Sequence, residues 1–224
     1  MPRFVRDNGL ALFFGLLFLL SAVAESVVGH SVFNSEQLQH GGEVMSYGRY
    51  LFSSHFGEAL VENWESEWLQ MFLFALATVW LLQRGSAESK EPGEEGLQSD
   101  EKPRVGGRAP DNAPRWAKLR GWRTAVYSNS FLIVMALIFL GSWLAQAATA
   151  WTEFNDEQNQ HHEPLVSFVT YLGEPDFWEK TMQNWQSEFL ALGAMTIFTV
   201  YLRQRGSTES KPVGAPHSET GTTV

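Results

Sequence analysis

The chain has 224 residues, a formal net charge of −9 and no cysteine, and its mean hydropathy is −0.16. The lack of cysteine excludes a disulfide framework, a thiolate metal site and a cysteine nucleophile. Because the balance is acidic and no basic module stands out, we expect no nucleic-acid partner. The average hydropathy conceals strong segregation, since residues 9–24, 68–82, 124–152 and 189–202 carry no charge.

The first apolar segment, residues 9–24 ("GLALFFGLLFLLSAVA"), follows Arg3 and Arg6. A bilayer core about 30 Å thick needs roughly 20 helical residues. A cleavable signal peptide has a similar pattern, but residues 129–150 match this segment without gaps, and an internal segment cannot be a signal peptide. We therefore expect a retained transmembrane helix at about 9–29.

The loop that follows contains "FNSEQLQH" at 33–40, and "FNDEQNQH" stands at 154–161. Each copy holds a Glu and a His four residues apart, Glu36 with His40 and Glu157 with His161. Together they would offer two carboxylates and two imidazoles, which suit Zn or Fe. In the structural alternative, Asn34 and Asn155 each begin a short surface helix, with a Gln at capping-box spacing. The sequence identifies no other cofactor.

The second apolar segment has only 15 residues, from Trp68 to Leu82. It covers about 22 Å, less than the hydrocarbon core. No Gly or Pro interrupts residues 58–84, so we expect one helix over that range. Its outer part then carries a polar face that the second copy repeats. The members of this face are Asn63, Ser66 and Glu67, with Asn184, Ser187 and Glu188 in the copy.

A third carboxylate, Glu25, falls near the outer end of the first helix, and its counterpart is Gln146. In the functional interpretation, Glu25, Glu67 and Glu188 form a polar cluster that binds a cation, a proton or a polar ligand, because carboxylates inside a membrane are costly. In the alternative, these residues lie in the headgroup layer of a thinned bilayer, and the Asn and Ser residues form ordinary bonds between helices.

The octet "QRGSAESK" at 83–90 returns as "QRGSTESK" at 204–211. Gly85 and Gly206 suit the C′ position that ends a helix, and the basic residues suit its negative end. The octets could also dock a cytoplasmic protein partner or a lipid headgroup. In the alternative, they only end a helix, and their other residues were simply kept after a recent duplication. The docking candidates are Arg84, Ser86, Glu88, Ser89, Arg205, Ser207, Glu209 and Ser210.

Residues 91–115 are rich in Pro, Gly and charge, which predicts a disordered cytoplasmic linker, and we expect the cytoplasmic tail 212–224 to be disordered too. The segment 116–123 interleaves Trp and basic residues and suits the anionic inner leaflet.

Adding 121 to a residue number gives its counterpart throughout. Between 8–90 and 129–211, about 32 of 83 positions are identical with no insertion, which predicts a tandem duplication. The first repeat is 1–90, and the second is 116–211 with helices at about 128–150 and 176–205. Two spans per repeat make the repeats parallel.

All Lys and Arg residues except Arg49 and Lys180 lie before the first span, between the second and third spans, or from the end of the fourth span onward. The positive-inside rule then puts both termini and residues 83–123 in the cytoplasm. Four short helices form a small bundle in the lipid bilayer, so we expect homo-oligomers.

With "NWESEWLQ", "NWQSEFLA" and the paired "QRGSxESK" in view, the chain resembles a family of small bacterial integral membrane proteins known only as a domain of unknown function. The resemblance covers nearly the whole chain apart from the linker. It implies a bacterial inner-membrane location and implies no activity.

The sequence therefore predicts an all-α membrane protein with four transmembrane helices, built as two tandem parallel helical hairpins. The first functional hypothesis is a non-enzymatic protein that binds or conducts a small cation or polar solute. The second is a scaffold or regulator that recruits a cytoplasmic partner through the octets. The third is a membrane metalloenzyme that uses the Glu and His pairs.

Overall fold

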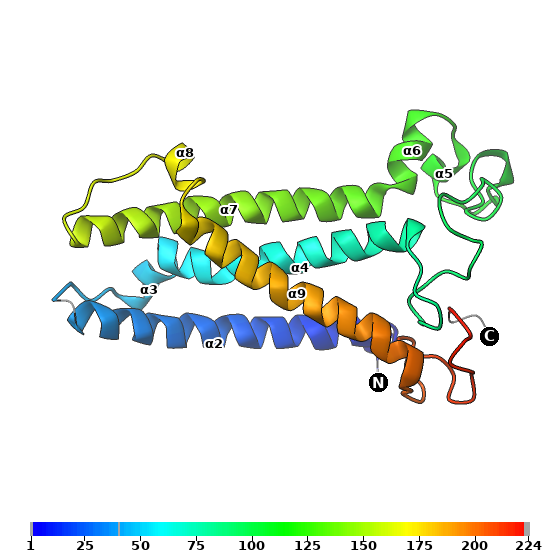
Figure 1. The fold of residues 1–224 in the computed structure, drawn as a ribbon, viewed down its shortest axis with the longest axis horizontal. Coiled ribbons are helices and arrows are strands. Elements are labelled where there is room, and N and C mark those ends of the chain that lie inside the picture. The colour runs from blue at the N-terminus through cyan, green and yellow to red at the C-terminus, as the bar shows by residue number, and fades with distance from the viewer. Residues whose placement is uncertain (1, 40, 222–224) are drawn as a thin grey trace. The chain divides into compact units, whose positions relative to one another are not determined.

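The computed structural model describes residues 2–39 and 41–221, and its regular elements there are all helical (Figure 1). This confirms the all-α prediction for the described part of the chain. In chain order the elements are α1 (Arg3–Asp7), α2 (Gly9–Gln39), α3 (Tyr47–Tyr50), α4 (Ser54–Trp80), η1 (Gly106–Arg108), α5 (Arg115–Lys118), α6 (Trp122–Ser128), α7 (Ser130–Gln160), α8 (Phe168–Tyr171) and α9 (Pro175–Tyr201).

The helices α2 and α7 each have 31 residues and are long and apolar enough to cross a membrane. They run ten residues past the expected ends at 29 and 150, because no strong helix breaker follows the apolar part. Both stop at a left-handed residue, Gly41 (φ 75°) and His162 (φ 58°). The next amide in each chain segment bonds to the carbonyl of Gln37 (2.7 Å) or Gln158 (2.8 Å), which is the Schellman pattern.

The helices α4 and α9 end at Trp80 and Tyr201, not at the expected residues 84 and 205. In α4, the Nζ of Lys90 donates to the carbonyl of Val79 (3.1 Å). In a longer helix, this carbonyl would accept from the amide of Gln83. The amide of Gln83 bonds to Ser89 Oγ instead (3.0 Å). Gly85 therefore lies in a turn beyond the helix, and its assignment as the C′ residue was wrong, as was that of Gly206.

The chain divides into two compact units. Unit 1 comprises the residues up to Glu62 together with Leu144–Phe177, and unit 2 comprises Asn63–Trp143 together with the residues from Trp178 onward. The long helices α4, α7 and α9 each contribute to both units.

Unit 1 packs around two aromatic clusters of the same design. In each cluster, a buried tyrosine contacts one ring from the preceding long helix and one from the following long helix, at centroid distances of 5.3 to 5.8 Å. The clusters are Phe33–Tyr50–Phe56 and Phe154–Tyr171–Phe177. Such ring pairs contribute more than their buried area alone, so each cluster ties a loop to the two long helices that flank it.

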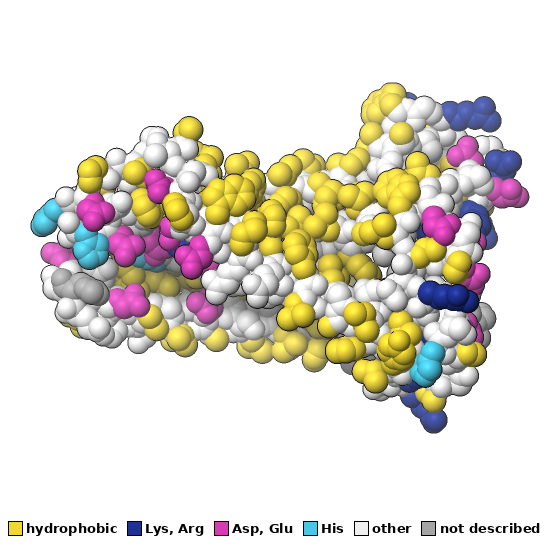
Figure 2. Space-filling view, viewed as in Figure 1, with side chains coloured by type: hydrophobic (Ala, Val, Ile, Leu, Met, Phe, Trp, Pro, Cys, Tyr) yellow, Lys and Arg dark blue, Asp and Glu magenta, His cyan; other side chains and the backbone are white. Residues whose placement is uncertain are grey.

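Unit 2 packs around a tryptophan-rich cluster whose members are Phe139, Trp143, Trp178, Trp185 and Phe189. Elsewhere the long helices present hydrophobic side chains on their surfaces (Figure 2). Only 6% of the apolar stretch of α2 and 22% of that of α7 is buried. This outward apolar surface is what a lipid bilayer would cover.

Candidate functional site

The loops of unit 1 are held by two asparagines at equivalent positions. Asn34 accepts from the amide of Met45 (2.7 Å) and donates to its carbonyl (3.0 Å). Asn155 forms the same two bonds with Val166, at 2.8 and 3.0 Å. Both asparagines lie inside long helices, so the capping-box interpretation was wrong. Their amides instead dock the returning loop onto the helix, because one side-chain amide can satisfy both polar groups of a backbone residue.

A pocket of about 470 Å³ opens in unit 1 beside this loop. Its walls come from the end of α2, the loop after it, the start of α4 and the end of α7. The lining residues are Phe33, Gln37, Glu43, Val44, Met45, Arg49, Phe52, Ser53, Ser54, His55, Asp156, Asn159 and Gln160. Carboxylates, one guanidinium, amides and two phenyl rings thus converge on one hollow, which is a typical composition for a small-molecule site.

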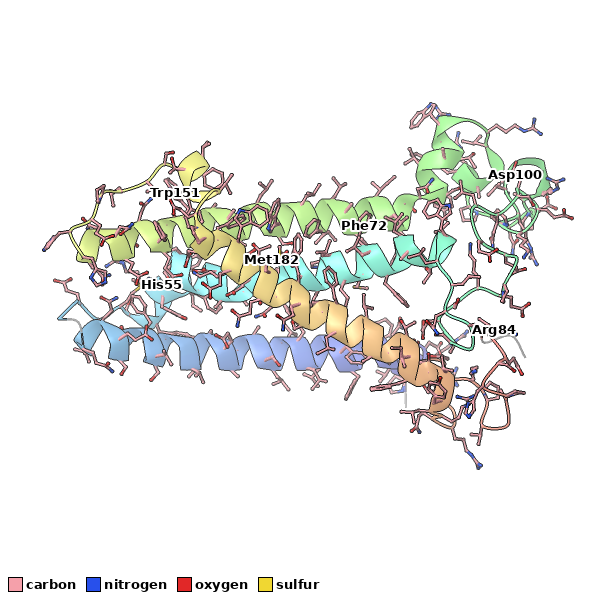
Figure 3. The ribbon with its side chains drawn as sticks, viewed as in Figure 1. His55, Phe72, Arg84, Asp100, Trp151 and Met182 are labelled. Atoms are coloured by element: carbon pink, nitrogen blue, oxygen red, sulfur yellow. The ribbon has the colours of Figure 1, made fainter. Side chains whose placement is uncertain are left out.

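His55 is the best-defined polar group of this pocket, at the first turn of α4 (Figure 3). Its Nδ1 bonds to the carboxylate of Glu153 on α7, and its ring packs on Phe33 at 4.5 Å. The hydrogen bond to Glu153 raises the pKa of His55 above its ordinary value; burial opposes the shift, and the charges of Glu153, Asp156 and Glu36 add to it. The imidazole therefore holds a proton to a higher pH than a free histidine.

Glu25 and the rest of the predicted carboxylate cluster lie in different units. Glu25 is exposed in unit 1. Burial raises the pKa of Tyr50, and the carboxylates of Glu25 and Glu153 raise it further, which places both near that hydroxyl. The remaining members belong to unit 2, where Glu67 is exposed and interacts electrostatically with the half-buried Glu188.

The polar residues beside these carboxylates bond within their own helices. Ser66 donates to the carbonyl of Asn63 (3.1 Å), and Ser187 donates to that of Asn184 (2.8 Å). Across the helices, Gln70 donates to the backbone carbonyl of Glu188 (3.3 Å). The predicted polar face is therefore partly used by local backbone bonds.

Sequence reasoning missed the most buried carboxylate of unit 2. Glu65 is fully buried, and the indole Nε1 of Trp185 donates to both of its oxygens at 3.0 and 3.1 Å. Trp185 in turn contacts Trp143 at a centroid distance of 6.5 Å. One signal was available, since the counterpart of Glu65 is Gln186, a charge difference between two neighbours, Trp64 and Ser66, that both copies share.

The two octets fold in the same way. In each, the last serine accepts from the amide of the first glutamine, at 3.0 Å in the first octet and 2.8 Å in the second. The first serine accepts from the amide of the glutamate, at 3.1 Å in both. Ser86, Ser89, Ser207 and Ser210 thus have internal structural roles.

The glutamates of the two octets meet. Burial raises the pKa of Glu88, and a hydrogen bond with Glu209 together with the charge of Glu209 raises it further. Arg84 is exposed in the loop beyond α4 (Figure 3), and Arg205 is exposed at the equivalent place.

The predicted metal ligands do not form a site in the part of the chain that the structure describes. His40 lies outside the described residues, while Glu36, Glu157 and His161 are exposed. Within residues 2–39 and 41–221, no three His, Asp or Glu side chains gather in a way that could hold a metal ion.

Comparison with known proteins identifies a family for this chain but does not indicate an activity. No curated protein and no solved structure matches the chain. The model of one family, a domain of unknown function (DUF6766), matches residues 1–222. That match confirms the resemblance to a family of unknown function, and the chain belongs to the DUF6766 family.

Proposed function

We propose that the chain is a four-span membrane protein of two tandem parallel hairpins, with both termini in the cytoplasm, located in a bacterial inner membrane. Four helices of 27 or 31 residues support the span count, since 27 residues extend about 40 Å. Helix pairs that begin and end 121 residues apart support the duplication. The Lys and Arg distribution supports the orientation.

Within this architecture, the pocket of unit 1 binds a small organic cation at the outer end. Its carboxylates, Glu43 and Asp156, outnumber its one guanidinium, Arg49, and Glu153 balances the charge of His55. Phe52 is 94% exposed at the pocket wall and can cover a cation with its ring. The combination of surplus negative charge and an aromatic wall is the observation that carries this proposal.

Calorimetric titration of the purified full chain with tetramethylammonium chloride tests the binding step. We expect Asp156→Asn to weaken the affinity about fivefold to tenfold, since it removes one of two negative charges near the cation. The matched control is Glu157→Gln, because Glu157 is the next residue on α7, is exposed and does not line the pocket. Sodium acetate at equal ionic strength should not compete with tetramethylammonium for the pocket.

Binding that is absent in the wild type, or equal in the two variants, would show that this pocket is not a cation site. The architecture is tested separately with reporters. A reporter fused after Lys211 should be cytoplasmic, and one inserted at Gly42 should face outward. The reverse pattern would overturn the orientation without bearing on the pocket chemistry.

A further inference from the structure

The two octets have the same fold but different surroundings, and both lie in unit 2. Their glycines adopt the same left-handed conformation, φ 87° at Gly85 and φ 83° at Gly206. The serine bonds described above are also the same in both. Any difference in what the two turns can bind therefore arises from their neighbours.

The turn of the first octet is filled by the C-terminal tail. The amide of Gly85 donates to the hydroxyl oxygen of Thr220 (2.9 Å), and the amide of Gly221 donates to the carbonyl of Ser86 (2.9 Å). A Cβ atom at Gly85 would collide with the carbonyl oxygen of His217. The glycine amide of this turn thus binds an oxygen atom that the chain itself supplies.

The turn of the second octet is open. Among the described residues, no atom outside Gly206 and its two chain neighbours lies within 4 Å of the position that a Cβ at Gly206 would take. A pocket of about 500 Å³ adjoins it, lined by residues 204–208 and 210–213. No described residue gives the amide of Gly206 an oxygen partner of the kind that Thr220 gives Gly85. The same turn is therefore present here without its occupant.

The two ionisable residues that line this open pocket are both basic. They are Arg205 and Lys211. Glu209 does not line the pocket, and its carboxylate accepts from the hydroxyl of Thr208 (3.2 Å) and forms a hydrogen bond with Glu88. The guanidinium of Arg205 is exposed and makes no hydrogen bond or ion pair with any described residue. The side chain of Lys211 is buried and donates to three tail carbonyls at 2.8 to 3.3 Å, while its burial and the charge of Arg203 lower its pKa. Arg205 is therefore the main positive charge of the pocket.

We propose that the second octet binds a phosphate group through Arg205, the hydroxyl of Ser207 and the amide of Gly206. A guanidinium fork matches two phosphate oxygens, and hydroxyl and amide donors suit the others. Ser207 Oγ accepts from the amide of Glu209, which leaves its proton free to donate. Since this octet follows α9, the proposed topology puts it at the cytoplasmic leaflet, and the phosphate belongs to an anionic phospholipid headgroup or to a soluble phosphate.

Native mass spectrometry of the full chain in detergent, titrated with phosphatidylglycerol, tests the site. We expect Arg205→Ala to weaken phosphatidylglycerol binding about tenfold and Arg205→Lys to weaken it less, because lysine keeps the charge but loses the fork. Arg84→Ala is the matched control, since Arg84 holds the same place in the octet whose turn the tail fills. Thermal unfolding of each variant checks that the fold is intact.

Two further arms identify the source of the phosphate. Weak binding of phosphatidylcholine supports an anionic headgroup. Displacement of phosphatidylglycerol by millimolar inorganic phosphate, with the same dependence on Arg205, assigns the site to soluble phosphate. Equal losses in the Arg84 and Arg205 variants, or no loss in either, would overturn the proposal. A reversed topology would leave binding in detergent unchanged, so the two failures are distinguishable.

Discussion

Glu153→Gln should remove a pH-dependent part of the stability of unit 1. The side chains of His55 and Glu153 are bonded and only 27% and 29% exposed. The pKa of His55 is raised in the folded chain, chiefly by this bond. A raised histidine pKa stabilises the fold fully below the unfolded value of about 6.5, and this stabilisation is lost as the pH rises through the folded value.

The size of the effect follows from the bond and its exposure. A hydrogen bond to a charged group contributes about 1.5–3 kcal/mol, and partial exposure to solvent reduces it to about 1 kcal/mol. For a chain of this length, such a loss lowers the melting temperature by about 2–4 °C. The variant should therefore melt a few degrees below the wild type at pH 6.

Thermal unfolding in detergent at pH 6 and pH 9 is the assay. The difference in melting temperature between the wild type and Glu153→Gln should be smaller at pH 9 than at pH 6, because the contribution of protonated His55 is lost as the pH rises through its raised pKa. Glu157→Gln on the same helix serves as the control, because its exposed side chain lies outside the pocket. An equal difference at both pH values would refute the role of His55 ionisation.

Three other outcomes are expected. Asn155→Ala should lower stability by about 1–2 kcal/mol in thermal unfolding, because it removes both bonds to the returning loop, and Asn34→Ala should match it. Lys211→Met should raise hydrogen exchange in the tail at least about tenfold, since three carbonyls lose their donor. If the outer carboxylates carry cations, the double variant Glu67→Gln and Glu188→Gln should lose cation flux in proteoliposomes, and unchanged flux would refute that use.

The helices were largely predictable because their signals are local. The apolar runs located all four long helices, and the asparagines and serines of both copies were recognised as significant. Their roles were not predictable from spacing. Asn34 and Asn155 suit a cap at the start of a helix, but the actual partners, Met45 and Val166, lie 11 residues away across a loop.

The pocket and the buried carboxylate required contacts between distant segments. His55 lies on α4 and Glu153 on α7, and Glu65 meets Trp185 across 120 residues. No periodicity within one helix encodes such pairs, because each depends on which faces of two helices meet. For the same reason, the sequence did not reveal that Thr220 of the tail fills the first octet.

The sequence by itself determined the helical class, the positions of the apolar segments and the 121-residue correspondence between the two halves. These features follow from the hydropathy of consecutive residues and from the identical residues of the two halves, and both can be read without knowing which segments are in contact. Only the tertiary structure decided that one octet is closed by the tail while its twin stays open beside Arg205. Nearly identical local sequences fold into the same turn, but what each turn can bind depends on the neighbours that folding places around it.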